Sequence, residues 1–294
     1  LESGRHGESE DDRVLGNPVG KAMPSIVSGF KTLRAVAFVT WKEWAAYRSH
    51  MLLSLAIGPA YFLAQVFIWK SVFAGKETLG GLTLEGMLLY YGASSVIYYL
   101  TMDFADWNLQ MLVRTGRFLT YILRPMSHRF FAFSQKAGHR MLGFVFEFIP
   151  VWLIFFFVFR IPLVPACPFW AALSIALAFV IMFLINYSAG LLAFWLTRTD
   201  GIRALIRLLR DLLAGVFIPL SFFPEAAQKI LFFLPFQFTS YVPVRVFLGS
   251  YDLAGIRLEI HEIVGLQAIM ALAMFGVTEA LWRLGIKRFT GAGA

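Results

Sequence analysis

Four ionisable residues fall within stretches of the chain that are otherwise apolar, and they are the first candidates for chemistry. They are Glu147, Arg207, Arg210 and Asp211. A charge at the centre of a bilayer costs about 2.5–3.5 kcal/mol on insertion scales, so such residues mark ion pairs, proton relays or transport paths. Arg207 and Asp211 are spaced i,i+4 and can neutralise each other on one helix face. Glu147 could relay protons, but we favour a structural ion pair between Glu147 and Arg210.

Motifs for catalysis on this chain are missing from the sequence. Gly75-Lys76 is followed by Glu77 and lacks the upstream glycine of a phosphate-binding loop, so no ATP site of that kind is predicted. His261-Glu262 has Gly265 where a zinc protease needs its second histidine. The five histidines are scattered, and no G-x-S-x-G elbow occurs. We therefore expect no catalytic residues, no metal site and no bound cofactor in this chain.

The amino-acid composition indicates whether the chain lies in water or in a membrane. Of its 294 residues, 59% are hydrophobic and only 15% are charged. A soluble domain has about 45–50% apolar and about 25% charged residues. The surplus of apolar side chains cannot fit inside one water-soluble core and predicts an integral membrane protein. Cys167 is the single cysteine, so no disulfide forms within the chain.

Windows without charges locate the helices that would cross the membrane. Crossing requires about 20 mostly apolar residues. The charge pattern predicts an all-α polytopic membrane protein with six transmembrane helices. The predicted spans lie near residues 51–73, 84–104, 140–160, 169–196, 203–222 and 260–282.

One further apolar stretch does not fit a span. Residues 230–244 carry no charge but are too few to cross, and Pro235 and Pro243 interrupt them. We expect residues 224–250 to form a re-entrant helical hairpin between the fifth and sixth spans. Backbone of this kind is tolerated at membrane depth only where protein or water covers it.

The distribution of basic residues predicts the orientation in the membrane. Twenty of the 26 Lys and Arg residues fall on the side of the two termini and six on the other side. Positively charged segments stay in the cytoplasm, so we expect a multi-pass protein of the plasma (inner) membrane with both termini cytoplasmic. Residues 1–29 are polar and resemble no signal peptide, which predicts a disordered cytoplasmic tail. The net charge of +8 then reflects topology, and no nucleic-acid partner is expected.

Two segments are expected on the cytoplasmic face. Residues 30–48 place Trp41 and Trp44 on one helical stripe, which predicts an amphipathic helix in the membrane interface. This helix is either a plain anchor, which we favour, or a lever between a partner and the first span. Residues 103–140 are basic and form either a topology-setting loop on anionic lipid or a docking segment for another protein. Composition alone favours the lipid-bound loop.

Three segments together resemble the permease subunits of ABC-2 type exporters, in the branch with six spans. They are Ile-Leu-Arg-Pro-Met at 122–126, Ile-Pro-Leu-Ser-Phe-Phe-Pro at 218–224, and Trp-Arg-Leu-Gly-Ile-Lys-Arg-Phe at 282–289. Phe289 stands where that family usually has Tyr, and Thr290 where an acidic or polar residue is common. The resemblance covers about residues 30–292, and residues 30–294 are expected to form one transmembrane domain.

The resemblance implies partners and sites. A separate P-loop ATPase, in two copies that bind ATP and Mg, would supply energy, and a second permease subunit, identical or homologous, would complete the pathway among membrane lipid. The expected ATPase-docking residues are Trp41, Trp44, Arg117, Leu119, Tyr121, Leu123 and Arg124. The expected pathway-lining residues are Tyr90, Tyr91, Ser94, Ser95, Tyr98, Phe217, Ser221 and Phe222, unless the tyrosines serve ordinary packing. The cargo would be amphipathic: a drug-like molecule, a peptide, a lipid or a glycan.

Two other functions stay open at this stage. A proton-coupled secondary carrier would use Glu147 as its relay, and a non-transport membrane enzyme or scaffold would use none of these residues. A P-loop ATPase that accompanies the chain would favour the exporter over both alternatives.

Overall fold

The computed structural model describes residues 26–45, 48–124, 126–196 and 199–289, with side chains described from residue 31 except at 43–54. Most of the predicted tail at 1–29 lies outside these residues, and its last four positions belong to a helix, α1 (Ile26–Ala45). The side chain of Trp44, expected to dock the ATPase, also lies outside the described part.

Long apolar helices make up most of the described chain. Four helical stretches are long and apolar enough to cross a membrane: Leu55–Val72 within α2, His128–Phe157, Pro168–Phe194 and Ile260–Ile286. A further long helix, α3, carries tyrosines and serines among its apolar residues. The bounds of these elements are α2 Arg48–Val72, α3 Leu84–Thr101, α6 His128–Gly143, α7 Ile149–Phe157, α8 Pro168–Leu191 and α12 Ile260–Ile286.

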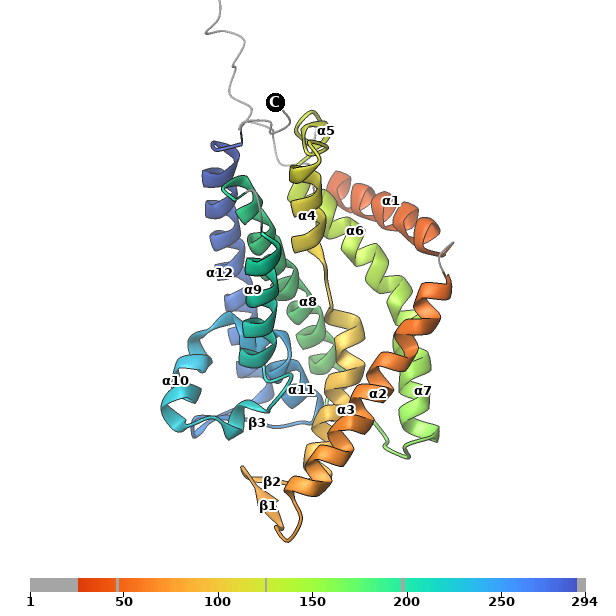
Figure 1. Ribbon diagram of the computed structural model, residues 1–294, viewed down its shortest axis with the longest axis vertical. Coiled ribbons are helices and arrows are strands. Elements are labelled where there is room, and N and C mark those ends of the chain that lie inside the picture. Colours follow the sequence, from red (N-terminus) through yellow and green to blue (C-terminus); the bar gives the residue numbers. More distant parts are fainter. Residues whose placement is uncertain (1–25, 46–47, 125, 197–198, 290–294) are drawn as a thin grey trace, which may run out of the picture.

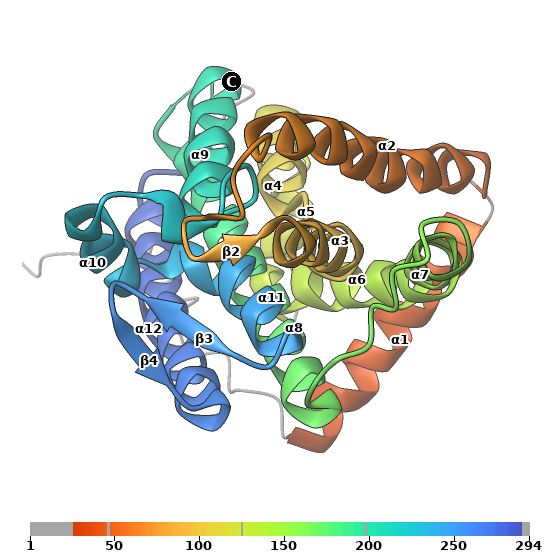
Figure 2. The ribbon, with the colours of Figure 1, turned by 90° about the horizontal axis from the view of Figure 1, so that it is seen from below.

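Four helices, α3, α4, α11 (Tyr241–Phe247) and α12, pack against α8 (Figures 1 and 2). At one end of the molecule, here called the α5 end, lie α4 (Ala105–Arg114), α5 (Leu119–Ile122) and the last turn of α12. At the opposite end, here called the hairpin end, lie the short antiparallel hairpins β1–β2 and β3–β4. Apart from these two short hairpins, the regular elements of the described residues are helices, which is consistent with the all-α prediction. The strands of the hairpins are β1 Thr78–Leu79, β2 Leu82–Thr83, β3 Tyr251–Leu253 and β4 Ile256–Leu258.

The third predicted span begins earlier than its sequence suggests. A single helical stretch runs from His128 to Phe157, through a π-helical turn at Phe144–Phe148 that holds Glu147. The prediction began this span near residue 140 because Lys136 and Arg140 read as loop charges. In the structure both charges lie on the helix and are paired with carboxylates inside the protein, at Asp103 and Glu147. Glu147 therefore lies well beyond the first turns of this helix.

The fifth predicted span, 203–222, is broken. The helix α9 (Asp200–Leu213) has 14 residues, which is too short to cross alone. Gly215 adopts a left-handed conformation with φ of 79°, which ends the helix. A short 3₁₀ turn follows at Leu220–Phe222.

The region predicted to be re-entrant consists of short helices at the hairpin end. A 3₁₀ turn at Pro235–Thr239 separates α10 (Glu225–Phe233) from α11 (Tyr241–Phe247). Elsewhere in the chain, a 3₁₀ turn at Leu192–Phe194 extends α8. The backbone breaks at Pro235 as the sequence predicts. α11 contacts α3 and α8, so this segment is packed against the long helices.

Candidate functional site

A joint between two helices is the first element of the candidate site. α3 ends at Thr101 and α4 begins at Ala105, so three residues connect the two helices. The side chain of Asp103 is fully buried, and its Oδ2 accepts a hydrogen bond of 2.9 Å from the amide of Ala105 at the start of α4. Lys136 from α6 places its Nζ 3.9 Å from the other carboxylate oxygen. This ion pair links the α3–α4 joint to α6.

Asn186 connects this joint to α9. Its amide nitrogen donates to the backbone carbonyl of Asp103 at 3.0 Å. Its amide oxygen accepts from Arg210 Nη1 at 2.6 Å, and Arg210 Nε donates to Asp211 at 2.9 Å. Asn186 is 4% exposed, so these bonds form in a medium of low polarity where they are strong. One amide on α8 thus joins the α3–α4 joint to α9.

Asp106, on the first turn of α4, makes the second connection to α9. Arg203 Nε lies 3.7 Å and Arg207 Nη2 3.5 Å from Asp106 Oδ2. α4 also lies directly on α8, because a Cβ added to Gly190 would lie 3.1 Å from the Cα of Asp106. The i,i+4 pair predicted between Arg207 and Asp211 is therefore replaced by pairs with Asp106 and Arg210.

Glu147 has a partner other than the one predicted. Its Oε2 lies 3.7 Å from Arg140 Nη1, and Arg140 also donates to the carbonyl of Tyr99 at 2.6 Å. Arg210, the expected partner, binds Asn186 and Asp211 instead. The seven-residue spacing of Arg140 and Glu147 places both on the same helical stretch, so this pair forms locally.

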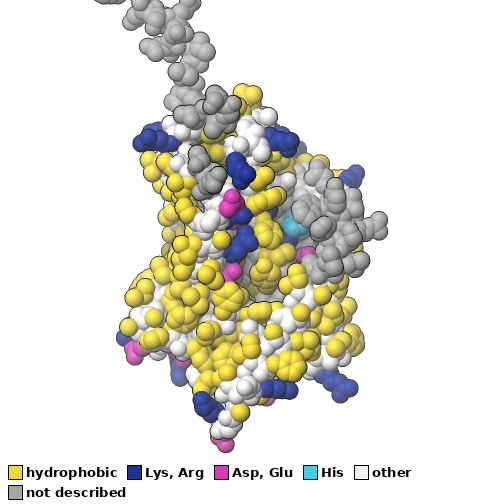
Figure 3. Space-filling model, viewed as in Figure 1, with side chains coloured by type: hydrophobic (Ala, Val, Ile, Leu, Met, Phe, Trp, Pro, Cys, Tyr) yellow, Lys and Arg dark blue, Asp and Glu magenta, His cyan; other side chains and the backbone are white. Residues whose placement is uncertain are grey.

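Together these residues form an ionic network that links α4, α6 and α9 at the middle of the molecule. Figure 3 shows basic and acidic side chains alternating on the face between α9 and α4, with hydrophobic side chains on both sides. The cations are Arg114, Lys136, Arg140, Arg203, Arg207 and Arg210, and the carboxylates are Asp103, Asp106, Glu147, Asp200 and Asp211.

α9 is inverted relative to the surface helix of a soluble protein. Leu205 and Leu208 are 54% and 56% exposed, whereas Arg210 is 6% exposed. The charged face turns towards the protein and the leucines turn outward. This arrangement is stable where the surroundings of the helix are apolar, as in a lipid bilayer.

The segment predicted to dock an ATPase projects from the α5 end. Phe118 anchors it: the ring is fully buried and packs edge-on against Phe194, Trp282 and Phe289, at centroid distances of 5.3, 6.0 and 5.3 Å. Beyond this anchor, Leu119 is 48% and Leu123 is 84% exposed.

The other docking residues lie on the same projection or on α1. Arg117 and Arg124 are exposed, and the guanidinium of Arg124 lies 4.3 Å from the ring centre of Tyr121. Trp41 of α1 is 41% exposed and stacks on Phe38 at 6.1 Å. α1 itself packs on α6, since a Cβ on Gly138 would lie 2.5 Å from the backbone of Ala37. The structure does not bring Trp41 into contact with the α4–α5 segment through any contact of the described residues.

The predicted pathway residues divide into a buried and an exposed group. Tyr90 and Tyr91 are buried, and their hydroxyls donate at 2.7 Å to the carbonyls of Gly215 and Phe217, which the end of α9 leaves free. Ser94 and Ser95 are also buried within the chain. The exposed group lies on α3 and on the loop and 3₁₀ turn that follow α9. Tyr98 is 42% and Phe217 40% exposed, and Ser221 and Phe222 are partly exposed.

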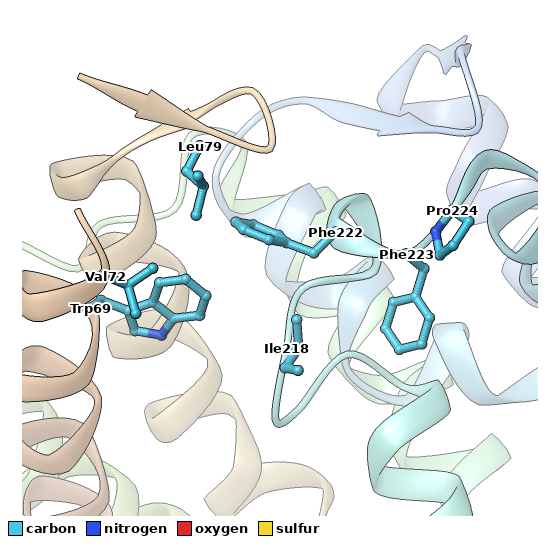
Figure 4. Close-up of a pocket in the computed structure, with 7 residues that line it drawn as sticks. All are labelled: Trp69, Val72, Leu79, Ile218, Phe222, Phe223 and Pro224. Atoms are coloured by element: carbon cyan, nitrogen blue, oxygen red, sulfur yellow. The ribbon is translucent and has the colours of Figure 1, made fainter. Parts of the chain in front are cut away.

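An apolar pocket of about 400 Å³ opens at the hairpin end (Figure 4). Phe222 separates its two sides and lies 5.3 Å from the ring of Trp69. A Cβ on Gly80 would lie 2.9 Å from the Phe222 ring, so the β1–β2 turn rests on that ring. The pocket is lined by Trp69, Val72, Leu79, Ile218, Phe222, Phe223 and Pro224.

Asp103, Asn186 and Phe118 were not predicted as site residues. Asn186 carries an amide in the longest charge-free stretch of the chain. A polar side chain in a long apolar helix needs a hydrogen-bond partner, so Asn186 could have been predicted as a site residue. Asp103 directly follows the charge-free stretch 86–102 and could have been predicted to hydrogen-bond the start of the next helix. Phe118 is one of 31 Phe residues, and nothing in its local sequence marks it as an anchor. Among the described residues, no group of three or more His, Cys, Asp or Glu could hold a metal ion.

A bundle of long apolar helices whose interior holds paired charges is a polytopic α-helical membrane protein. A family profile described as ABC-2 family transporter protein matches residues 60–293, and the chain belongs to this family. The resemblance drawn from the three sequence segments is thereby confirmed, and the chain is a membrane permease of the ABC transporter class. No curated protein and no solved structure matched the chain in the same comparisons.

Proposed function

We propose that this chain is the transmembrane subunit of an ATP-driven exporter that moves an amphipathic cargo outward. A separate P-loop ATPase, in two copies, binds ATP and Mg and supplies the energy, and a second permease subunit, identical or homologous, completes the pathway. The chain spans the plasma membrane with both termini in the cytoplasm. Family membership over residues 60–293 supports a transport role.

The observation that carries the proposal is the α4–α5 projection. It presents Leu119 and Leu123 to solvent while Phe118 fixes its base to the ends of α8 and α12. Exposed apolar residues next to cations are typical of a protein-binding surface, in which a few anchors contribute most of the binding energy. The ATPase would bind here.

The ionic network gives this projection a mechanical connection to the bundle. A displacement of α4 moves Asp106 relative to Arg203 and Arg207, and moves Asp103 relative to Asn186. Because the partners lie on α8 and α9, a push on α4 reaches both helices through short polar contacts. The exposed pathway residues Tyr98 and Phe217 lie on or next to the helices that would move.

The rival carrier function lacks a comparable observation. A proton relay needs a carboxylate that exchanges protons with both sides of the membrane. Glu147 is 4% exposed and lies 3.7 Å from Arg140, in a pair that is local to one helical stretch. We therefore propose a structural role for Glu147.

The test is association with an ATPase followed by transport. The tagged chain would be purified from its native membranes, and a co-purifying chain would be identified by peptides that contain a phosphate-binding loop. The complex would then be reconstituted into vesicles and assayed for ATP hydrolysis. We expect the complex to hydrolyse ATP and the permease chain alone to show no turnover, because it has no phosphate-binding loop.

Variants separate docking from folding. The double variant Leu119→Ala with Leu123→Ala should lose at least about tenfold in ATPase affinity, since anchor residues often contribute about 2 kcal/mol or more. The matched control is Ile230→Ala with Phe233→Ala, which removes two apolar side chains that are 64% and 74% exposed at the hairpin end. Normal association of the first variant, or equal loss in both, would refute docking at the α4–α5 projection.

A further inference from the structure

Among the described residues, the ionic network carries one more cation than it has carboxylates, because three of its arginines share two acids. Lys136, Arg140 and Arg210 each have a carboxylate of their own, at Asp103, Glu147 and Asp211. The remaining cations, Arg114, Arg203 and Arg207, share Asp106 and Asp200.

Arg207 depends on one carboxylate that is both buried and shared. Among the described residues its one carboxylate partner is Asp106, at 3.5 Å, and Arg203 shares that carboxylate. Arg203 also reaches Asp200, which it shares with Arg114. Arg114 depends on Asp200 alone, an acid that is 61% exposed, whereas Arg207 depends on Asp106 alone. Its side chain is 43% exposed, whereas that of Asp106 is 5% exposed. The uncompensated charge therefore lies at the surface of the α9–α4 face.

One aromatic ring lies beside the exposed guanidinium, and two further exposed rings lie on α3 and α4. Arg207 lies 5.7 Å from the ring centre of Phe104, at the α3–α4 joint, and that ring is 39% exposed. Trp107, three residues further along, is on the same side of α4 and is 48% exposed. Tyr98, on α3, is 42% exposed. A cation with neighbouring exposed rings can bind an anionic head and an apolar body at once.

We propose that this face, formed by Arg207, Phe104, Trp107 and Tyr98, binds an anionic amphiphile. A phosphate or carboxylate head would lie on Arg207, because a guanidinium forms strong charge-assisted hydrogen bonds with such groups. The apolar part would lie along the exposed rings of Phe104 and Trp107. An uncompensated cation is costly in an apolar medium, so an anion that reaches it gains more than it would in water.

This inference deepens the proposed function by naming the class of cargo, and it rests on that function only for the outward direction of movement. The binding itself requires the permease chain alone. A failure to find an ATPase partner would refute the proposed function and leave the binding result intact. A failure of binding would leave the ATPase result intact.

The experiment measures lipid preference at Trp107. The purified chain would be reconstituted into phosphatidylcholine vesicles that contain brominated phosphatidic acid or brominated phosphatidylcholine, both of which quench nearby tryptophans. Each protein would be measured with and without Trp107→Phe, so that the difference reports Trp107. We expect phosphatidic acid to bind there about tenfold more tightly than phosphatidylcholine, as one charge-assisted contact implies.

Two variants that are expected to change the preference for phosphatidic acid in opposite directions make the test specific. Arg207→Gln removes the surplus charge and should abolish the preference, and Arg203 still compensates Asp106 in this variant, so folding is preserved. Asp106→Asn removes the shared carboxylate and should increase the preference. Arg257→Gln is the matched control, because Arg257 is an exposed guanidinium paired with a carboxylate at the hairpin end, 3.4 Å from Asp252. It should leave the preference unchanged.

The outcomes are decisive for the site. Loss of the preference in Arg207→Gln together with its increase in Asp106→Asn supports the proposal. An unchanged preference in Arg207→Gln, or a decrease in Asp106→Asn, overturns it, because a merely structural network would be weakened by either change. Complete removal of the preference by millimolar inorganic phosphate would assign the site to a free anion and overturn the amphiphile.

Discussion

The region between α4 and α9 and the hairpin end are stabilised by different interactions. From the α5 end to the middle, charged and amide side chains join α4, α6, α8 and α9 through Asp103, Asp106 and Asn186. Towards the hairpin end, aromatic rings pack in a continuous core, and tyrosine hydroxyls donate to backbone carbonyls, as Tyr90 does to Gly215 and Tyr241 to Asp252.

This difference indicates where motion can occur. A core of interlocked rings has one favourable arrangement, because its contacts depend on close fit. A network in which Asp106 and Asp200 are each shared by two arginines has several arrangements with similar numbers of ion pairs. We therefore expect conformational change to concentrate at the α3–α4 joint and α9, and the hairpin end to move as a unit.

The largest effect should follow the loss of Asp103. Asp103→Ala leaves Lys136 without its carboxylate and removes the hydrogen bond to the Ala105 amide at the start of α4. Breaking a buried pair in this way costs about 3–5 kcal/mol. The free energy of unfolding would be measured by denaturant titration in mixed micelles.

The control is an ion pair at the opposite end. Asp252→Ala removes a carboxylate whose partner Arg257 is 87% exposed at its side chain. An exposed pair contributes about 0–1 kcal/mol, so this variant should be near neutral. Equal losses in the two variants would contradict the comparison between the ends.

The next effect concerns the contact between α1 and α6. Gly138→Ala would place a methyl group 2.5 Å from the backbone of Ala37, so α1 must shift. Overpacking of this kind costs about 1–3 kcal/mol. In contrast, Gly265→Ala on α12 meets no atom within 4 Å and should stabilise the helix by about 0.5–1 kcal/mol. A thermal melt of both variants measures the difference, and a neutral Gly138→Ala would show that α1 does not pack here.

A smaller loss is expected from the tyrosines at the end of α9. Tyr90→Phe leaves the buried carbonyl of Gly215 without its 2.7 Å hydrogen bond, at a cost of about 1–2 kcal/mol. Tyr98→Phe, at a tyrosine that is 42% exposed, should be neutral for stability. Differential scanning of the two single variants gives the comparison. A loss in Tyr98→Phe as large as that in Tyr90→Phe would indicate that both hydroxyls are structural.

The sequence predicted the membrane class, the family and the ranges of most long helices because those features depend on composition and charge spacing. The prediction failed where contacts between distant parts of the chain override a local sequence pattern. Lys136 and Arg140 read as loop residues, yet buried carboxylates allow the helix to run from His128 to Phe157. The break at Gly215 was missed because its freed carbonyls are satisfied by tyrosines more than 100 residues away in the sequence, a relation that no local pattern carries.

The kind of residue in the candidate site could be predicted from the sequence, but which charged residues pair with each other could not. The four ionic residues predicted within apolar stretches do belong to the network, but each has a partner other than the predicted one, because helix packing decides which charges meet. Asp106 meets Arg207 across 101 residues of sequence. The i,i+4 rule that suggested Asp211 describes an isolated helix, whereas α9 turns Arg207 towards α4.

The smallest effect is expected at the Glu225–Lys229 pair on α10, and it tests the hairpin end by pH. The Lys229 ammonium, 2.7 Å from the carboxylate, holds the pKa of Glu225 below its usual value by a hydrogen bond and by its charge. A folded-state pKa that is lower than the unfolded one stabilises the protein above the unfolded pKa, and this contribution disappears as the pH falls through the folded pKa. Because both side chains are exposed, water and salt screen the pair, so Glu225→Gln should match the parent at neutral pH in 1 M salt. Carboxyl-carbon NMR of the parent would measure the pKa directly. A value at or above about 4.3, the usual one for Glu, would show that the pair does not form in solution.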